Sequence, residues 1–215
     1  MLRPLQQLLE TIYDAPTDHD VSDFLFTHRS GLPPARRHEA SDEELIVVEQ
    51  DDCATIGLYL DASLLQRLQR ESPLECLHGG NVADLWTALE GVSHFAYLSF
   101  KAGYDRPVSQ LELELQAEVD KYVVSLWLLR AQYPRRFPRE LHPLLFTKTR
   151  IDPRLDAPRS ALYRAANRQA ARFCASLERA FASDRRVLRT EAIAWLRRFY
   201  RLGSGSKLRL IEQLA

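Results

Sequence analysis

The chain has 215 residues, 46% of them hydrophobic and 27% charged, which is typical of a globular protein and excludes a disordered segment. No apolar run approaches the roughly 20 residues that a membrane-spanning helix needs, and residues 1–10 lack the apolar core of a signal peptide. We therefore expect one cytoplasmic domain without a membrane span. Three widely spaced cysteines without a CxxC pattern predict neither a disulfide framework nor a zinc site: Cys53, Cys76 and Cys174.

Acidic and basic residues are segregated along the chain, although the formal net charge is zero. Residues 1–129 carry 9 Lys+Arg against 22 Asp+Glu, a net charge of −13, and residues 130–215 carry 20 against 7, a net charge of +13. The two parts can neutralise each other inside one fold, or the basic part can attract a polyanion. Both interpretations require arginines of the C-terminal part to meet negative charge.

The N-terminal third combines short helices with strands. Apolar residues at helical spacing predict a helix over residues 2–12, and a second short helix is expected over residues 21–28. Residues 30–43 hold glycine, proline and charged residues without apolar periodicity, which predicts an exposed, mobile loop. Two β-rich runs at residues 45–48 and 54–60 flank an acidic turn and predict a β-hairpin.

After the hairpin the pattern is helical. Asp61 is expected to cap a short helix, and Ser109 with Glu112 forms a capping box. The further helices are expected over residues 81–102, 109–132, 141–146, 160–181, 186–202 and after residue 206. The sequence thus predicts a mainly α, compact helical bundle with a small N-terminal β-hairpin. We expect a single domain of residues 1–215, in which residues 1–72 form a hairpin-bearing subregion and residues 73–215 the helical core.

The helix expected over residues 84–101 is mostly apolar but carries Glu90 and His94, four residues apart and so on one face. A buried carboxylate and imidazole need partners, because an unpaired charge in the interior is costly. The pair could ligate a metal ion or serve as acid and base. The simpler interpretation is a structural one, in which Glu90 accepts a hydrogen bond from His94.

The next helix carries several acidic residues. Glu112 and Glu114 predict a solvated acidic face near the helix N-terminus. Glu118 falls on the apolar stripe of this helix that is expected to face the core, so the sequence leaves open whether its side chain is buried or solvated. Lys121 follows one turn later. Buried glutamates here would require arginine, a cation or a shared proton. The catalytic candidates are therefore Glu90, His94 and Glu118, and the possible metal ligands are Glu90, His94, Glu114 and Glu118.

Arginines recur every four residues along the helix expected over residues 160–181. Three such charges require something negative opposite them, either the helix of Glu114 and Glu118 or phosphate from a nucleic acid or nucleotide. The small-residue loop at 203–206 precedes the last helix and is a second candidate for an anion site. The predicted anion-binding residues are Arg164, Arg168, Arg172, Lys207 and Arg209.

The leading functional hypothesis is a non-enzymatic intracellular binding or adaptor protein. Its basic C-terminal part would contact a nucleic acid, a phosphorylated ligand or an acidic protein. The alternative is a helical enzyme with a pocket of Glu90, His94, Glu118 and Arg168 that acts on a phosphorylated or polar small substrate, with or without a metal ion. A structural oligomer that pairs through the hairpin edge is a third hypothesis. The sequence identifies no cofactor and no oligomeric state.

Overall fold

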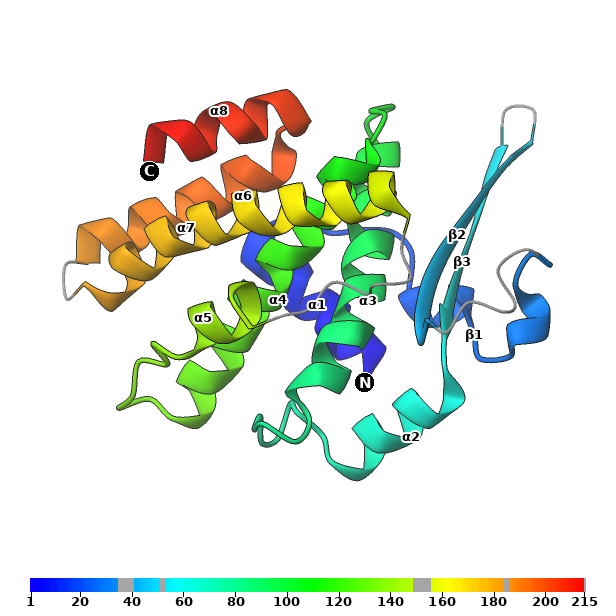
Figure 1. Cartoon of the computed structure of the whole chain (residues 1–215), viewed down its shortest axis with the longest axis horizontal. Helices are drawn as coiled ribbons and strands as arrows, with labels where there is room; N and C mark the ends of the chain where they lie inside the picture. The colour runs from blue at the N-terminus through cyan, green and yellow to red at the C-terminus, as the bar shows by residue number, and fades with distance from the viewer. Residues whose placement is uncertain (35–40, 51–52, 149–155, 184–185, 215) are drawn as a thin grey trace.

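The computed structural model contains eight α-helices and a small three-stranded sheet within the ranges that it describes (Figure 1). These ranges are residues 1–34, 41–50, 53–148, 156–183 and 186–214. The predicted mainly α fold with an N-terminal hairpin is confirmed. Across the described ranges, every helix is too short or too polar to cross a membrane.

The helix boundaries follow capping residues that the sequence displays. The helices are α1 (Leu2–Tyr13), α2 (Ala62–Arg70), α3 (Val82–Ala102), α4 (Gln110–Gln132), α5 (Leu141–Phe146), α6 (Ala157–Ala182), α7 (Arg186–Arg201) and α8 (Ser204–Leu214). The Asp61 carboxylate accepts from the Ser63 amide at the start of α2, as predicted. The helix α6 begins three residues before the predicted 160, because Asp156 accepts from the amide of Arg159.

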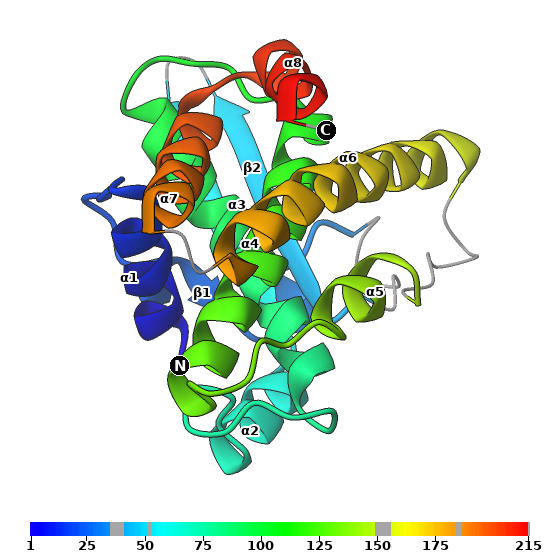
Figure 2. The same ribbon diagram turned by 90° about the vertical axis from the view of Figure 1, so that its left-hand side faces the viewer.

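Helices α3 and α4 form the centre of the molecule. Helix α3 packs against α1 and the sheet, and α4 packs against α5 and α6. Figure 2 shows α4 between α3 and α6. Because neighbours cover these two helices on several sides, their polar residues are buried along with the apolar ones.

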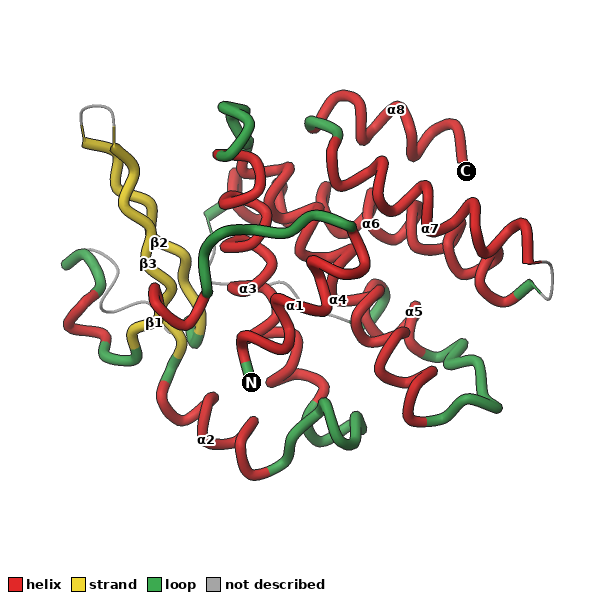
Figure 3. Tube along the Cα trace, turned by 180° about the vertical axis from the view of Figure 1, so that it is seen from behind, coloured by secondary structure: helices red, strands yellow, loops and turns green. Residues whose placement is uncertain are grey.

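The sheet contains β1 (Leu25–Phe26), β2 (Glu43–Gln50) and β3 (Cys53–Leu60) in the order β1-β3-β2 (Figure 3). Strands β2 and β3 form the predicted antiparallel hairpin, and β1 adds to β3 in parallel. The helix predicted over residues 21–28 is wrong: only one 3-10 turn forms there, and the pairing of Leu25–Phe26 with β3 overrides local helix propensity.

The loop predicted at residues 30–43 is only partly described. Its central residues 35–40 lie outside the described ranges. At its end the prediction is wrong, because Glu43 is the first residue of β2 and its side chain is largely buried. Pairing with Leu60 of β3 makes this residue part of the sheet.

Gly91 of α3 allows the hairpin to lie directly against the helix. A Cβ atom at this position would be 2.6 Å from Leu58 Cδ1 and 3.0 Å from Glu43 Cγ. Leu58 is fully buried, so its side chain would have to repack within the core to make room. The contact between the sheet and α3 therefore depends on glycine at this position.

We expect Gly91→Ala to lower the free energy of unfolding by about 1–3 kcal/mol, because the added methyl group overpacks this contact. Urea denaturation measures the difference. Gly79→Ala is the matched control, since a Cβ atom at Gly79 meets nothing within 4 Å. Equal stability of Gly91→Ala and the unmodified protein would contradict the tight contact.

Candidate functional site

Six charged side chains from three separate elements meet beside the sheet. They are Glu43 from β2, Glu90 and His94 from α3, and Glu114, Glu118 and Lys121 from α4. We call this group the acid–histidine cluster. The spacing i, i+4 and i+7 places the three α4 members on one face of that helix, opposite α3. The structure thus brings together all four of the predicted metal ligands.

Lys121 is the cationic partner of two of the carboxylates. Its Nζ donates to Glu90 Oε2 at 2.6 Å and to Glu118 Oε1 at 2.7 Å. The predicted hydrogen bond from His94 to Glu90 is therefore wrong, because an ammonium group from α4 binds the Glu90 carboxylate instead. Burial opposes the ionisation of Glu90, but the contact with Lys121 and the charge of His94 together outweigh it and lower the pKa of Glu90.

The His94 imidazole lies between two further carboxylates. Its Nδ1 is 3.8 Å from Glu43 Oε1, and its Nε2 is 3.7 Å from Glu114 Oε2. Both separations are too long for hydrogen bonds. Nε2 is buried and makes no hydrogen bond to any residue that the structure describes. The solvated acidic face predicted for Glu112 and Glu114 is wrong, because both side chains are buried.

Negative charge exceeds positive charge in the acid–histidine cluster. When all six groups are ionised, the four carboxylates and the two cations carry a net charge of −2. Burial raises the pKa of Glu43, and burial together with the nearby Glu90 and Glu43 charges raises the pKa of Glu114 to about 7. Burial disfavours the imidazolium, but the contact with Glu43 and the charge of Glu114 outweigh it and raise the pKa of His94 to about 9.

The predicted arginine row lies outside this cluster. Helix α6 packs on α4 as expected, but Arg164, Arg168 and Arg172 are exposed. Among the described residues, no ion pair joins them to Glu114 or Glu118, so the predicted ion pairs are wrong. The reason is that α6 turns its small and apolar residues toward α4 and its arginines toward solvent. An external anion for this row stays a prediction.

A second buried network lies on another face of α4. The Asp120 carboxylate accepts hydrogen bonds from Tyr13 Oη, from Ser93 Oγ at 2.6 Å and from Gln116 Nε2 at 2.8 Å. Gln116 Oε1 in turn accepts from Lys207 Nζ of α8 at 2.6 Å. These contacts connect α1, α3 and α8 through α4.

Helix α8 begins at Ser204, so the loop predicted at residues 203–206 is mostly the first turn of this helix, and that turn already contacts a carboxylate of the protein itself. The amide of Ser204 donates to Glu112 Oε2 at 2.8 Å, so Glu112 occupies the helix N-terminus that was predicted to bind an external anion. Lys207 is fully buried, whereas Arg209 is exposed. The two predicted anion-binding residues of this segment therefore face different environments and do not converge.

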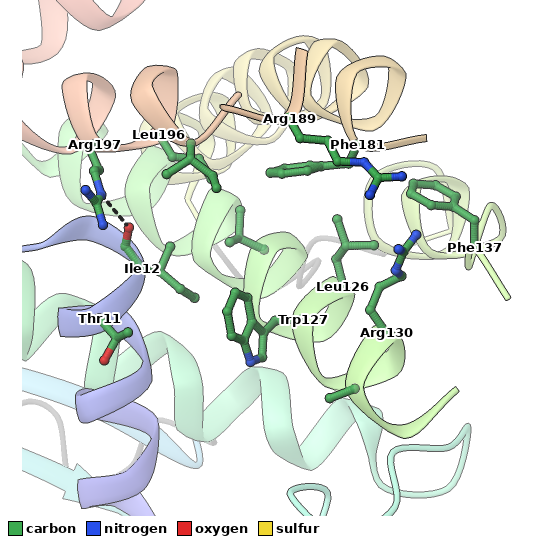
Figure 4. Close-up of a pocket in the computed structure, with 13 residues that line it drawn as sticks. Thr11, Ile12, Leu126, Trp127, Arg130, Phe137, Phe181, Arg189, Leu196 and Arg197 are labelled. Atoms are coloured by element: carbon green, nitrogen blue, oxygen red, sulfur yellow. Dashed lines mark hydrogen bonds between the residues drawn. The ribbon is translucent and has the colours of Figure 1, made fainter. Parts of the chain in front are cut away.

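An apolar groove that the sequence analysis missed opens between α1, α4, α6 and α7 (Figure 4). Its volume is about 560 Å³. Most of the side chains that line it are apolar: Ile12, Val123, Leu126, Trp127, Ala131, Phe137, Phe181, Ile193 and Leu196. The signal available in the sequence was Trp127, an aromatic residue on an otherwise core-forming helix, which is 53% exposed here.

Three arginines of the basic C-terminal part line the groove. Figure 4 shows Arg130 and Arg189 at the end near Phe137, and Arg197 at the end near Ile12. Arg130 lies over the Phe137 ring, 5.7 Å from its centroid. Arg197 is held by the C-terminus of α1, where its Nε donates to the Ile12 carbonyl at 3.4 Å.

A second cavity, of about 340 Å³, lies between the start of α3, the end of α4 and α5. Neither this cavity nor the groove is lined by a residue of the acid–histidine cluster. The structure does not bring together the four residues of the predicted enzyme pocket. Glu90, His94 and Glu118 lie in the acid–histidine cluster, whereas Arg168 lies on the exposed face of α6.

Comparison with protein-family models, curated proteins and solved structures gave no significant match to this chain.

Proposed function

We propose that the protein is a non-enzymatic binding protein that holds an anionic amphiphile in the groove between α1, α4, α6 and α7. The ligand class is a molecule with an apolar chain and a carboxylate or phosphate head group. The supporting observation is an apolar floor with arginines at its rim. A volume of about 560 Å³ lies within the range of small-molecule sites, which are mostly apolar with a few polar groups that fix orientation.

The head group would lie at the end of the groove where Arg130 and Arg189 are found, with Arg130 as its main cation because the Nε of Arg189 already donates to the Ser183 carbonyl at 3.1 Å. A guanidinium group offers a planar pair of donors that suits both carboxylate and phosphate oxygens. Arg197 at the other end already binds α1 and is assigned a structural role. The apolar chain would then cover Trp127 and Ile193, two large side chains that solvent reaches.

The proposed site uses the basic part of the chain. The arginines at the groove belong to residues 130–215, which carry the net charge of +13. The sequence predicts a phosphate-bearing or acidic partner for these residues. Exposed large apolar side chains beside cationic groups are also what an amphiphile with an anionic head requires.

We expect the full chain to bind one molecule of palmitate or of hexadecyl phosphate in calorimetric titrations. The neutral analogue hexadecanol should bind at least about 10-fold more weakly, because it lacks the charge-assisted hydrogen bonds worth roughly 1.5–3 kcal/mol. Inorganic phosphate alone should bind weakly, since it has no apolar chain to bury. Equal affinity for hexadecanol and palmitate would reject the anionic head group.

Two variants locate the site. Arg130→Gln should weaken palmitate binding about 10–100-fold, and Ile193→Glu should abolish it by placing a negative charge on the apolar floor. Arg168→Gln on the exposed row of α6 is the matched control and should bind as the unmodified protein does. A loss in Arg168→Gln with full binding in Arg130→Gln would move the anion to α6 and reject the groove.

A further inference from the structure

We propose that Glu90, His94 and Glu114 bind a first-row divalent metal ion such as Zn²⁺, with Glu43 orienting the imidazole from its other side. This site is separate from the groove and independent of its ligand. Carboxylate oxygens and an imidazole nitrogen are the donors that such ions take in proteins. One potential ligand atom from each of the three residues lies within 4.8 Å of the other two.

The contact between His94 and Glu114 has the length expected of two ligands on one ion. Atoms about 2.1 Å from a common metal lie roughly 3.0–3.6 Å apart at bond angles of about 90–120°. The Nε2 to Oε2 distance is 3.7 Å, longer than a hydrogen bond and within about 0.1 Å of this range. Small side-chain rotations would close the site around an ion.

The buried Nε2 of His94 points independently to a ligand. The side chain is only 9% exposed, and within the described residues Nε2 has no hydrogen-bond partner. Buried polar atoms are paired in most native structures, so a nitrogen without a hydrogen bond that lies 3.7 Å from the Glu114 carboxylate requires an explanation. A metal ion accepts the nitrogen lone pair and supplies the missing partner.

Glu43 provides the support that metal-bound histidines usually have. Its carboxylate faces Nδ1 at 3.8 Å, on the opposite edge of the ring from Glu114. The negative charge of this carboxylate favours a proton on Nδ1, which leaves the lone pair of Nε2 for the metal. Gly91 allows β2 to come close enough for this contact.

The charges of the acid–histidine cluster also favour a cation. Metal binding replaces the proton on Nε2, and with Lys121 still charged the net charge of the six groups and the ion changes from −2 to −1. Lys121 would remain on Glu118 and share Glu90 with the ion. The Glu90 side chain is 24% exposed, so one of the three ligands is in contact with solvent.

The test is a calorimetric titration of the chelator-treated full chain with Zn²⁺. We expect one ion per chain, with affinity reduced at least about 100-fold in His94→Ala and about 10–100-fold in Glu43→Gln. His28→Ala, which removes an exposed imidazole outside the cluster, should bind like the unmodified protein. Mg²⁺, which prefers oxygen ligands and retains water, should not compete.

Two further measurements separate a metal site from a structural role of His94. The visible absorption of bound Co²⁺ should be lost in His94→Ala, and Zn²⁺ should raise the melting temperature of the unmodified protein but not that of this variant. Circular dichroism checks that the variant folds, and Glu114→Gln replaces it if it does not. Zn²⁺ affinity that is the same in the unmodified protein, His94→Ala and Glu114→Gln would overturn the proposal.

Discussion

Replacing Lys121 by methionine should lower the free energy of unfolding by about 3–5 kcal/mol near pH 7 in the presence of a chelator. The ammonium group is the direct partner of Glu90 and Glu118, and all three side chains are largely buried. Removing the cation leaves two carboxylates without their partner in the interior, where unpaired charge is most unfavourable. Urea denaturation measures the loss.

A surface ion pair provides the matched control for this variant. Arg136 and Glu140 also form a close pair at helical spacing, but their side chains are 71% and 57% exposed. Arg136→Met should therefore lose less than about 1 kcal/mol. If both methionine variants lost less than about 1 kcal/mol of unfolding free energy, the ion pairs of Lys121 would behave like exposed ones and not like buried ones.

Removing the two negative charges should restore most of the stability that is lost in Lys121→Met. In the triple variant that adds Glu90→Gln and Glu118→Gln, no charge remains for Lys121 to neutralise, and neutral polar groups are easier to bury than ions. The proposed metal site makes one further difference: Zn²⁺ should stabilise Lys121→Met more than the unmodified protein, because the ion supplies positive charge that the variant lacks.

The second large effect concerns Lys207 and pH. Burial, helped by the charge of Lys101, lowers the pKa of Lys207 from 10.5 to about 7, and the opposing effects of Glu112 and Asp120 do not offset it. The ammonium group lies over the rings of Tyr97 and Phe199, at 4.4 Å from each centroid. Such contacts favour the charged form, but by less than burial disfavours it.

The direction of the pH dependence follows from proton binding. Between pH 7 and pH 10.5 the unfolded chain holds the Lys207 proton and the folded chain does not, so stability rises with pH in this window. We compare the free energy of unfolding of the unmodified protein with that of Lys207→Met. The difference, unmodified protein minus variant, should increase by about 2 kcal/mol from pH 7 to pH 9. Taking this difference cancels groups that titrate in both proteins.

Denaturant titrations of the two proteins at several pH values measure this difference. A difference that stays constant from pH 7 to pH 9 would show that Lys207 remains protonated in the fold. In that case Gln116 and the aromatic rings would fully offset the effect of burial.

The helices of this protein could be predicted because their signals are local. Apolar periodicity and capping residues such as Asp61 and Ser109 lie close to the segments that they organise, and both side chains cap their helices. The second half of the predicted capping box is wrong, because the Glu112 carboxylate accepts from Tyr97 and from the Ser204 amide instead. The hairpin could be predicted for the same reason, from two β-rich runs and a short turn. The short segment at residues 21–28 was mispredicted because its conformation depends on pairing with β3, which is distant in the sequence.

The sequence also indicated which polar residues of the central helices are unusual, but not what they contact. Glu90 and His94 stood out because they interrupt an apolar helix, and Glu118 because it falls on a core stripe, whereas Glu114 was expected on a solvated face. The structure brings all four together. The predicted partner was an arginine row, yet the cations that meet these carboxylates are Lys121 and His94. Charge counts along a chain do not show which face of a helix is covered, and α6 buries the face opposite its arginines.

Two features were decided by the tertiary structure alone. Glu43 approaches His94 only because the hairpin folds back onto Gly91, and the apolar groove exists only where α1, α6 and α7 leave Trp127 of α4 partly uncovered. Local sequence determines the helices and the tight β2–β3 hairpin, because helix hydrogen bonds join residues four apart and the two hairpin strands are adjacent in the chain. The contents of a site depend on which elements pack against each other, and that packing is a property of the whole chain.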